Sequence, residues 1–160
     1  KIQLGNMDNA DFQSIINNPN NNRFEPQNPK IRSAYNYFFQ RLSQMSANQI
    51  NTFYYDLISN AIKFTPKGGH ISISTKEKII NNKRMIETEI RDTGIGINEE
   101  NMSKLFQIEQ NYNSKGTNNE SGTGLGLILC KEFINQNDGN IRVESELTVG
   151  SSFIFDLECT

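Results

Sequence analysis

The sequence has little of several features that would point to particular classes of protein. It holds only two cysteines in 160 residues, too few for the disulfide framework of a small secreted domain. The formal net charge is -2, and no run of lysine or arginine indicates binding to nucleic acid or insertion into a membrane surface. No apolar run approaches the ~20 residues of a membrane span, and no signal-peptide pattern begins the chain. We therefore expect a cytoplasmic chain whose thiols, at Cys130 and Cys159, are buried or unreactive.

What is present predicts one domain of the α+β class. Helices are expected at 30–45, 47–64, 99–106 and 125–137, with a helical turn or two within 8–17, and strands at 1–4, 70–75, 85–91, 139–146 and 151–158. Because the strands come in hairpins rather than singly between helices, we expect a two-layer sandwich: a mixed, mostly antiparallel sheet covered on one face by helices. Residues 1–45 would hold an asparagine-rich insertion and a packing helix, and residues 46–160 the core.

Polar residues share one face of the expected helix 47–64. Asp56, Asn60 and Lys63 are spaced i, i+4 and i+7, and Phe64 follows Asn60 by four. The apolar side of the helix comprises Phe53, Leu57, Ile58, Ala61 and Ile62. The polar face is either a solvated strip or a site for magnesium and phosphate, because Mg²⁺ takes one or two protein oxygens alongside substrate phosphates.

Two glycine-containing stretches follow. Asp92-Thr93-Gly94-Ile95-Gly96 comes after an expected strand, and it is either a plain turn or a place where a carboxylate accepts a hydrogen bond from an exocyclic amine beside a flat ring. Gly122, Gly124 and Gly126 precede a helix whose N-terminus would favour an anion. We expect that helix to pack Ile128, Leu129 and Phe133 against the sheet, and residues 107–121 to form a lid hinged at these glycines.

These stretches together resemble the sequence boxes of the sensor histidine kinases. Residues 56–66 resemble the N box, residues 92–97 the G1 box, Leu105-Phe106 a reduced F box, and residues 122–127 the G2 box. The resemblance runs from about residue 46 to residue 157. It implies the catalytic ATP-binding domain of such a kinase, with the Bergerat fold that gyrase-type ATPases share.

The resemblance also implies a role for individual residues. Asn60 would hold Mg²⁺, Lys63 would contact phosphate, and Asp92 would bind the adenine amine. The implied nucleotide site comprises Asn60, Lys63, Phe64, Asp92, Gly94, Gly96, Ile97, Gly122, Thr123, Gly124, Leu125, Gly126 and Ser152. The implied cofactors are ATP and Mg²⁺, and the implied partners are a histidine-bearing dimerisation domain and a response-regulator receiver domain. The chain would then be cytoplasmic, or the cytosolic part of a larger membrane-bound sensor.

Three departures from the pattern bear on function. Asp56 stands where these kinases carry asparagine and gyrase-type relatives a glutamate, so it is either a tolerated substitution, a ligand of the metal's water shell or a general base. The only histidine, His70, begins an expected strand and is not expected to accept phosphate. The F box has Ile108 near an expected phenylalanine.

The sequence therefore favours a catalytic domain that transfers the γ-phosphoryl group of ATP·Mg to a histidine on a separate domain. Two alternatives stay open. One is an ATPase in which Asp56 activates water, and the other is a degenerate module that binds nucleotide without catalysis.

Overall fold

Five strands form one antiparallel sheet in the computed structural model, in the order β1-β2-β3-β5-β4. They are β1 (Ile2–Asp8), β2 (His70–Ile80), β3 (Lys83–Asp92), β4 (Asn140–Glu146) and β5 (Gly150–Glu158). The structure describes residues 2–8, 47–107 and 125–158, and for residues 2–8 and 47–52 it describes the backbone alone. The expected helix at 30–45, the asparagine-rich insertion and the lid beyond Gln107 lie outside these ranges.

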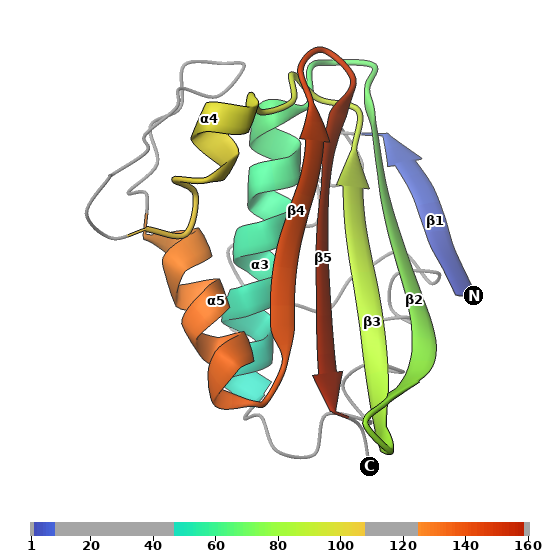
Figure 1. The fold of residues 1–160 in the computed structure, drawn as a ribbon. Coiled ribbons are helices and arrows are strands. Elements are labelled where there is room, and N and C mark those ends of the chain that lie inside the picture. Colours follow the sequence, from blue (N-terminus) through green and yellow to red (C-terminus); the bar gives the residue numbers. More distant parts are fainter. Residues whose placement is uncertain (1, 9–46, 108–124, 159–160) are drawn as a thin grey trace.

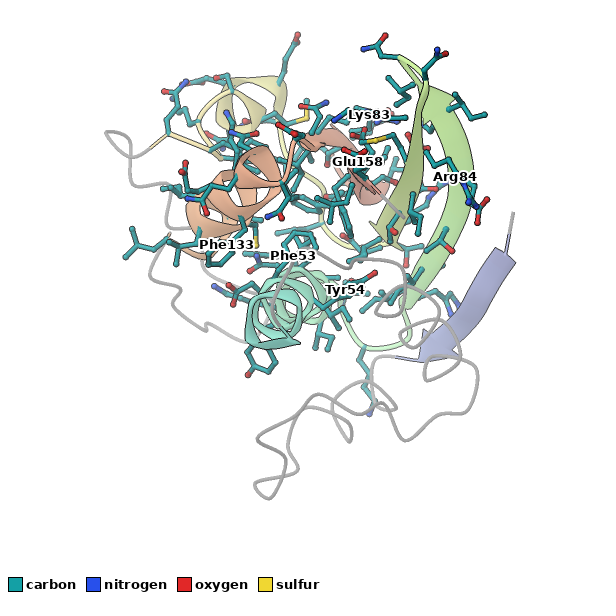
Figure 2. All side chains as sticks on the ribbon, turned by 90° about the horizontal axis from the view of Figure 1, so that it is seen from below. Phe53, Tyr54, Lys83, Arg84, Phe133 and Glu158 are labelled. Carbon is teal, nitrogen blue, oxygen red and sulfur yellow. The ribbon has the colours of Figure 1, made fainter. Side chains whose placement is uncertain are left out.

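Helices cover one face of this sheet, which confirms the predicted two-layer α+β architecture (Figure 1). The long helix α3 (Ala47–Phe64) begins and ends where the sequence predicts, and α5 (Gly126–Gln136) packs against both α3 and the sheet. The predicted apolar side of α3 is buried: Phe53, Leu57, Ile58, Ala61 and Ile62. Figure 2 shows Phe53 between α3 and the curved sheet, and its ring meets that of Phe155 edge to face at 4.5 Å.

The β2–β3 hairpin is longer than predicted, because β2 continues to Ile80 and β3 starts at Lys83. Asn81 and Asn82 connect them with φ values of 50° and 63°. Two successive residues with positive φ form the tight turn that matches the twist of a hairpin, and asparagine tolerates this region better than most residues. Strand β1 is also longer than predicted, since it runs to Asp8 and pairs with His70–Thr75 of β2.

Two expectations for the helices were wrong. The short helix α4 (Glu99–Met102) does not reach Phe106, because beyond it the backbone hydrogen bonds change to i→i−3 spacing, as from Lys104 to Asn101. In α5 the fully buried residues are Cys130 and Ile134, whereas Leu129 is 47% exposed. The helix is rotated from the predicted orientation because it contacts α3 as well as the sheet, although Phe133 does pack partly against the core.

A buried carboxylate organises the sheet face that lies away from the helices. Glu87 alternates with the inward Ile86 on β3, and it pairs with Lys76 at 2.8 Å, with Lys78, and with Arg142 of β4 at 3.3 Å. Burial alone would raise the pKa of Glu87, but the hydrogen bonds and charges of the two lysines outweigh it and lower the pKa to about 2 from 4.5. The pairs therefore connect three strands across this face.

Because its pKa is lower in the folded state, Glu87 contributes stability above pH 4.5 that disappears as the pH falls towards 2. We expect Glu87→Gln to lower the unfolding free energy at pH 7 by roughly 1 to 3 kcal/mol. The loss is no larger because solvent around the partly exposed lysines screens their attraction to Glu87. Urea unfolding at several pH values measures it. The difference from the unmodified chain should shrink between pH 4.5 and 2.

The matched control is Glu100→Gln, which removes an exposed carboxylate from its pair with Lys104 and should leave stability unchanged. A gap between Glu87→Gln and the unmodified chain that stays constant down to pH 2 would contradict the role given to the ionised carboxylate.

Candidate nucleotide site

The polar face of α3 lies at the boundary between the core and solvent. Asp56, Asn60, Lys63 and Phe64 are all half-buried, while their apolar neighbours on the helix are almost fully buried. The Lys63 ammonium stands 5.0 Å from the centre of the Phe64 ring. The packing of the apolar face therefore fixes which way these polar side chains point, and it keeps an amide, a carboxylate and an ammonium on one rigid element.

At the end of β3, Asp92 is 4% exposed. Its Oδ1 accepts hydrogen bonds from the backbone N–H of Gly94 at 2.8 Å and of Ser151 at 3.2 Å. Burial raises the pKa of Asp92, and these two hydrogen bonds partly oppose that rise. Among the described residues none donates to Oδ2, so one oxygen is held by the protein and the other is available to a ligand.

The Asp92 turn and the end of α3 form one continuous structure. The N–H of Ile95 donates to the carbonyl oxygen of Phe64 at 3.0 Å. Gly94 lies so close to this carbonyl that a β-carbon on residue 94 would stand 2.3 Å from the oxygen. The structure thus brings together Phe64, Asp92, Gly94 and Gly96, which the sequence analysis assigned to the same site from separate motifs.

Asp56 faces the N-terminus of α5. Its carboxyl group would lie 3.5 Å from a β-carbon placed on Gly126, at the first residue of that helix. Burial raises the pKa of Asp56. Burial also raises the pKa of the Cys130 thiol to about 12, with a further contribution from the Asp56 charge. The carboxylate therefore stands where the helix dipole favours negative charge.

The reduced F box, Leu105-Phe106, lies next to α5. Leu105 is buried, Phe106 packs partly against the core, and the Lys131 ammonium of α5 lies 5.5 Å from the Phe106 ring centre. Gly122, Thr123, Gly124 and Ile108 lie outside the described residues. The structure thus positions both flanks of the predicted lid, Gln107 and Leu125, and the lid itself stays a prediction.

The residue beside Asp92 is Ser151, whereas the residue that the resemblance implies in the nucleotide site is Ser152. In the β3–β5 register Asp92 pairs with Ser151, while Ser152 pairs with the exposed Arg91. Successive residues of a strand point to opposite faces, so Ser152 shares its face with Arg91. The sequence did hold a signal for this: Ser151 has the same parity as the apolar residues Phe153 and Phe155, which mark the helix-covered face.

No helix among the described residues is long and apolar enough to span a membrane. Within the same ranges, no cluster of three or more histidine, cysteine, aspartate or glutamate side chains could hold a metal ion by itself. Mg²⁺ takes one or two protein oxygens alongside the oxygens of a bound phosphate, and the amide oxygen of half-buried Asn60 is a group of that kind.

Comparison with known proteins gives one family. The model of the family "Histidine kinase-, DNA gyrase B-, and HSP90-like ATPase" matches residues 46–160. The chain is 39% identical over 102 residues to the signal transduction histidine-protein kinase BarA of Escherichia coli K12, covering 64% of this chain and 11% of BarA. It is 38% identical over 111 residues to the autoinducer 2 sensor kinase/phosphatase LuxQ of Vibrio vulnificus CMCP6, covering 68% of this chain and 13% of LuxQ.

Solved structures agree with the sequence relatives. The catalytic domain of histidine kinase ThkA, in a nucleotide-free form, is 27% identical with a TM-score of 0.55, covering 71% of this chain and 68% of that one. The similarity to sensor histidine kinases that the sequence boxes predicted is thereby confirmed. The chain spans little more than a tenth of the length of BarA and LuxQ.

The turn after Asp92 offers a test of the geometry. Gly96 has a φ of +70°, and a β-carbon there would meet the carbonyl oxygen of Glu146 at 2.0 Å, whereas Gly68, with a φ of +85°, has open space around it. We expect Gly96→Ala to lower the unfolding free energy by at least about 2 kcal/mol, and Gly68→Ala by only about 1 kcal/mol, the cost of the backbone strain alone. Thermal or urea unfolding measures both, and equal losses would contradict the close contact of residue 96 with the β4–β5 hairpin.

Proposed function

Because the chain belongs to the family of histidine kinase-, DNA gyrase B- and HSP90-like ATPases, we propose that it is the catalytic ATP-binding domain of a sensor histidine kinase. In this role it transfers the γ-phosphoryl group of ATP to a histidine on a separate domain. The observation that carries the proposal is the buried Asp92 carboxylate, which keeps one oxygen for a ligand at the edge of a glycine-lined turn.

Asp92 recognises the base. The 6-amino group of adenine donates to its Oδ2, because Oδ1 is occupied by two backbone N–H groups. Gly94 and Gly96 let the turn pack closely against the carbonyl groups of Phe64 and Glu146, and Phe64 and Ile97 supply apolar surface for the flat ring. A charge-assisted hydrogen bond in a site of low polarity gives strong discrimination, since a base lacking the donor leaves a buried carboxylate unpaired.

The phosphates lie between α3 and the N-terminus of α5. Lys63 neutralises phosphate charge, and the backbone N–H groups at Leu125 and Gly126 donate to phosphate oxygens, together with the glycines at 122 and 124 and Thr123. The amide oxygen of half-buried Asn60 suits Mg²⁺, and the carboxylate of Asp56 one turn earlier suits its water shell. When bound, the metal would neutralise the charge of the transferring phosphoryl group.

The phosphoryl acceptor lies outside this domain. His70 is exposed at the start of β2 and forms part of the sheet, and nothing in its position favours it as an acceptor. The relatives are several times longer than this chain, which leaves room for a histidine-bearing dimerisation domain and a receiver domain as partners. Catalysis here consists of holding the nucleotide while the acceptor domain supplies the nucleophile.

The position of Asp56 favours a second candidate function, hydrolysis of ATP. A half-buried carboxylate at the phosphate end of the site, with its pKa raised by burial, is a better general base than an ordinary surface aspartate. Asparagine in the same place could not take a proton. The two candidates differ in whether water or a histidine attacks the γ-phosphorus.

Removal of the Asp92 carboxylate tests the nucleotide site. We expect Asp92→Ala to weaken binding of a non-hydrolysable ATP analogue by roughly 10- to 100-fold, the worth of one charged hydrogen bond, in a calorimetric titration with Mg²⁺. Asp138→Ala, which removes an exposed aspartate, should bind as the unmodified chain does. If Asp92→Ala retains full affinity while its melting temperature is unchanged, the base pocket has been assigned wrongly.

One assay with ATP labelled in its γ-phosphate distinguishes phosphoryl transfer to a histidine from hydrolysis by water. We expect Asn60→Ala to abolish labelling of a histidine-bearing acceptor domain supplied separately, because it removes the proposed metal ligand, while Asn135→Ala on the exposed side of α5 labels normally. The kinase predicts no steady phosphate release without the acceptor. Steady release that is lost in Asp56→Asn would instead establish the ATPase, and binding of the analogue without either reaction would indicate the degenerate module.

A further inference from the structure

Ser145 is a hydrogen-bonding centre that joins three separate parts of the chain. From β4, its hydroxyl oxygen lies 2.8 Å from the N–H of Ile97, 2.9 Å from the carbonyl oxygen of Gly150 and 2.9 Å from the hydroxyl oxygen of Ser151. A serine hydroxyl has one hydrogen to donate and two lone pairs that accept. All three are used here, so the side chain is fully satisfied in one orientation.

The identity of the partners fixes the direction of each hydrogen bond. The carbonyl of Gly150 can only accept, so it receives the Ser145 hydrogen, and the N–H of Ile97 can only donate. The Ser151 hydroxyl must therefore be the donor in its contact with Ser145. Its own hydrogen is committed, and only its lone pairs stay available to a further partner.

The same residues touch Asp92. The backbone N–H of Ser151 donates to Oδ1 of Asp92, and the two residues face each other in the register of β3 and β5. A β-carbon on Gly150 would stand 2.0 Å from the carbonyl oxygen of Asp92. Ser145 thus holds the turn at Ile97 on one side and the strand that orients the Asp92 carboxylate on the other.

We propose that Ser145 is a positioning residue for recognition of the base. It fixes the distance between the turn after Asp92 and the start of β5, and it turns the Ser151 hydrogen away, so that Asp92 and Ser151 both present acceptors. A base edge bearing an amino group fits this pair, and one bearing an oxo group is repelled by it. The proposal rests on the nucleotide site proposed above and adds to it the origin of the choice between 6-amino and 6-oxo purines.

Calorimetric titration of the 160-residue chain with ADP, IDP and tripolyphosphate, all with Mg²⁺, tests it. ADP and IDP differ at the 6-position, which is amino in ADP and oxo in IDP, and at the adjacent N1, which accepts a hydrogen bond in ADP and donates one in IDP. Tripolyphosphate has no base. We expect Ser145→Ala to weaken ADP binding about 10-fold, the size of one or two lost hydrogen bonds, while IDP and tripolyphosphate change less than about threefold. Ser145→Thr keeps the hydroxyl and should restore the preference for ADP.

Ser74→Ala is the matched control, because it removes a half-buried strand hydroxyl on the opposite sheet face, bonded to Glu89. Amide exchange at Ile97 should quicken in Ser145→Ala alone. An unchanged ratio of ADP to IDP affinity in Ser145→Ala would overturn the proposal, and so would an equal loss for all three ligands, which signals general destabilisation. An unmodified chain that binds no ADP would overturn the proposed function itself, together with the role of Ser145.

Discussion

The site depends on the burial of one carboxylate. An ionised group without partners is costly to bury, and Asp92 is almost completely removed from water. Two backbone N–H groups, from the turn that follows it and from the neighbouring strand, offset part of that cost through a single oxygen. The remaining cost of burial raises the pKa of Asp92. A ligand that donates a hydrogen bond to Oδ2 would reduce that cost. In the proposed site, the same burial would favour a ligand that donates a hydrogen bond to Asp92.

This arrangement requires a rigid frame, and the frame is α3 against the sheet. The aromatic contact of Phe53 with Phe155 and the buried aliphatic side chains fix how α3 is rotated about its axis and where it lies along the sheet. Because the carbonyl of Phe64 ends the helix and accepts from Ile95, the position of α3 is passed directly to the turn after Asp92. The polar face of α3 and the turn that follows Asp92 are thus held in one fixed arrangement.

The sequence predicted those features that local pattern determines. The sequence pattern predicted both ends of α3, and alternation predicted both hairpins, although the β2–β3 hairpin is longer than expected. The errors concern features that a partner element decides. The rotation of α5 follows from its packing against α3, which periodicity in α5 alone does not contain, so Leu129 was placed in the core in error.

Ser151 and Ser145 show the same limit within the site. Which serine stands beside Asp92 depends on the register between β3 and β5, and a shift of one residue exchanges the two faces of a strand. The hydroxyl of Ser145 is still harder to foresee, because its partners come from a turn 48 residues earlier and a hairpin five residues later. Sequence motifs predicted residues that would touch a ligand, whereas the contacts that Ser145 and Ser151 make with their neighbours are seen only in the structure.

Asp56 is a different case from Ser145 and Ser151. It departs from the asparagine of the family pattern in charge and hardly at all in shape. Asparagine and aspartate have nearly the same size and shape, so asparagine would fit the space that Asp56 occupies beside Gly126. The aspartate therefore changes the charge at the N-terminus of α5 without changing the packing. Burial raises the pKa of Asp56, whereas the dipole of α5 favours the ionised form of a carboxyl group at this place. A carboxylate in this place would be stabilised by a nearby cation, or would take up a proton, at the point where phosphate is expected to bind.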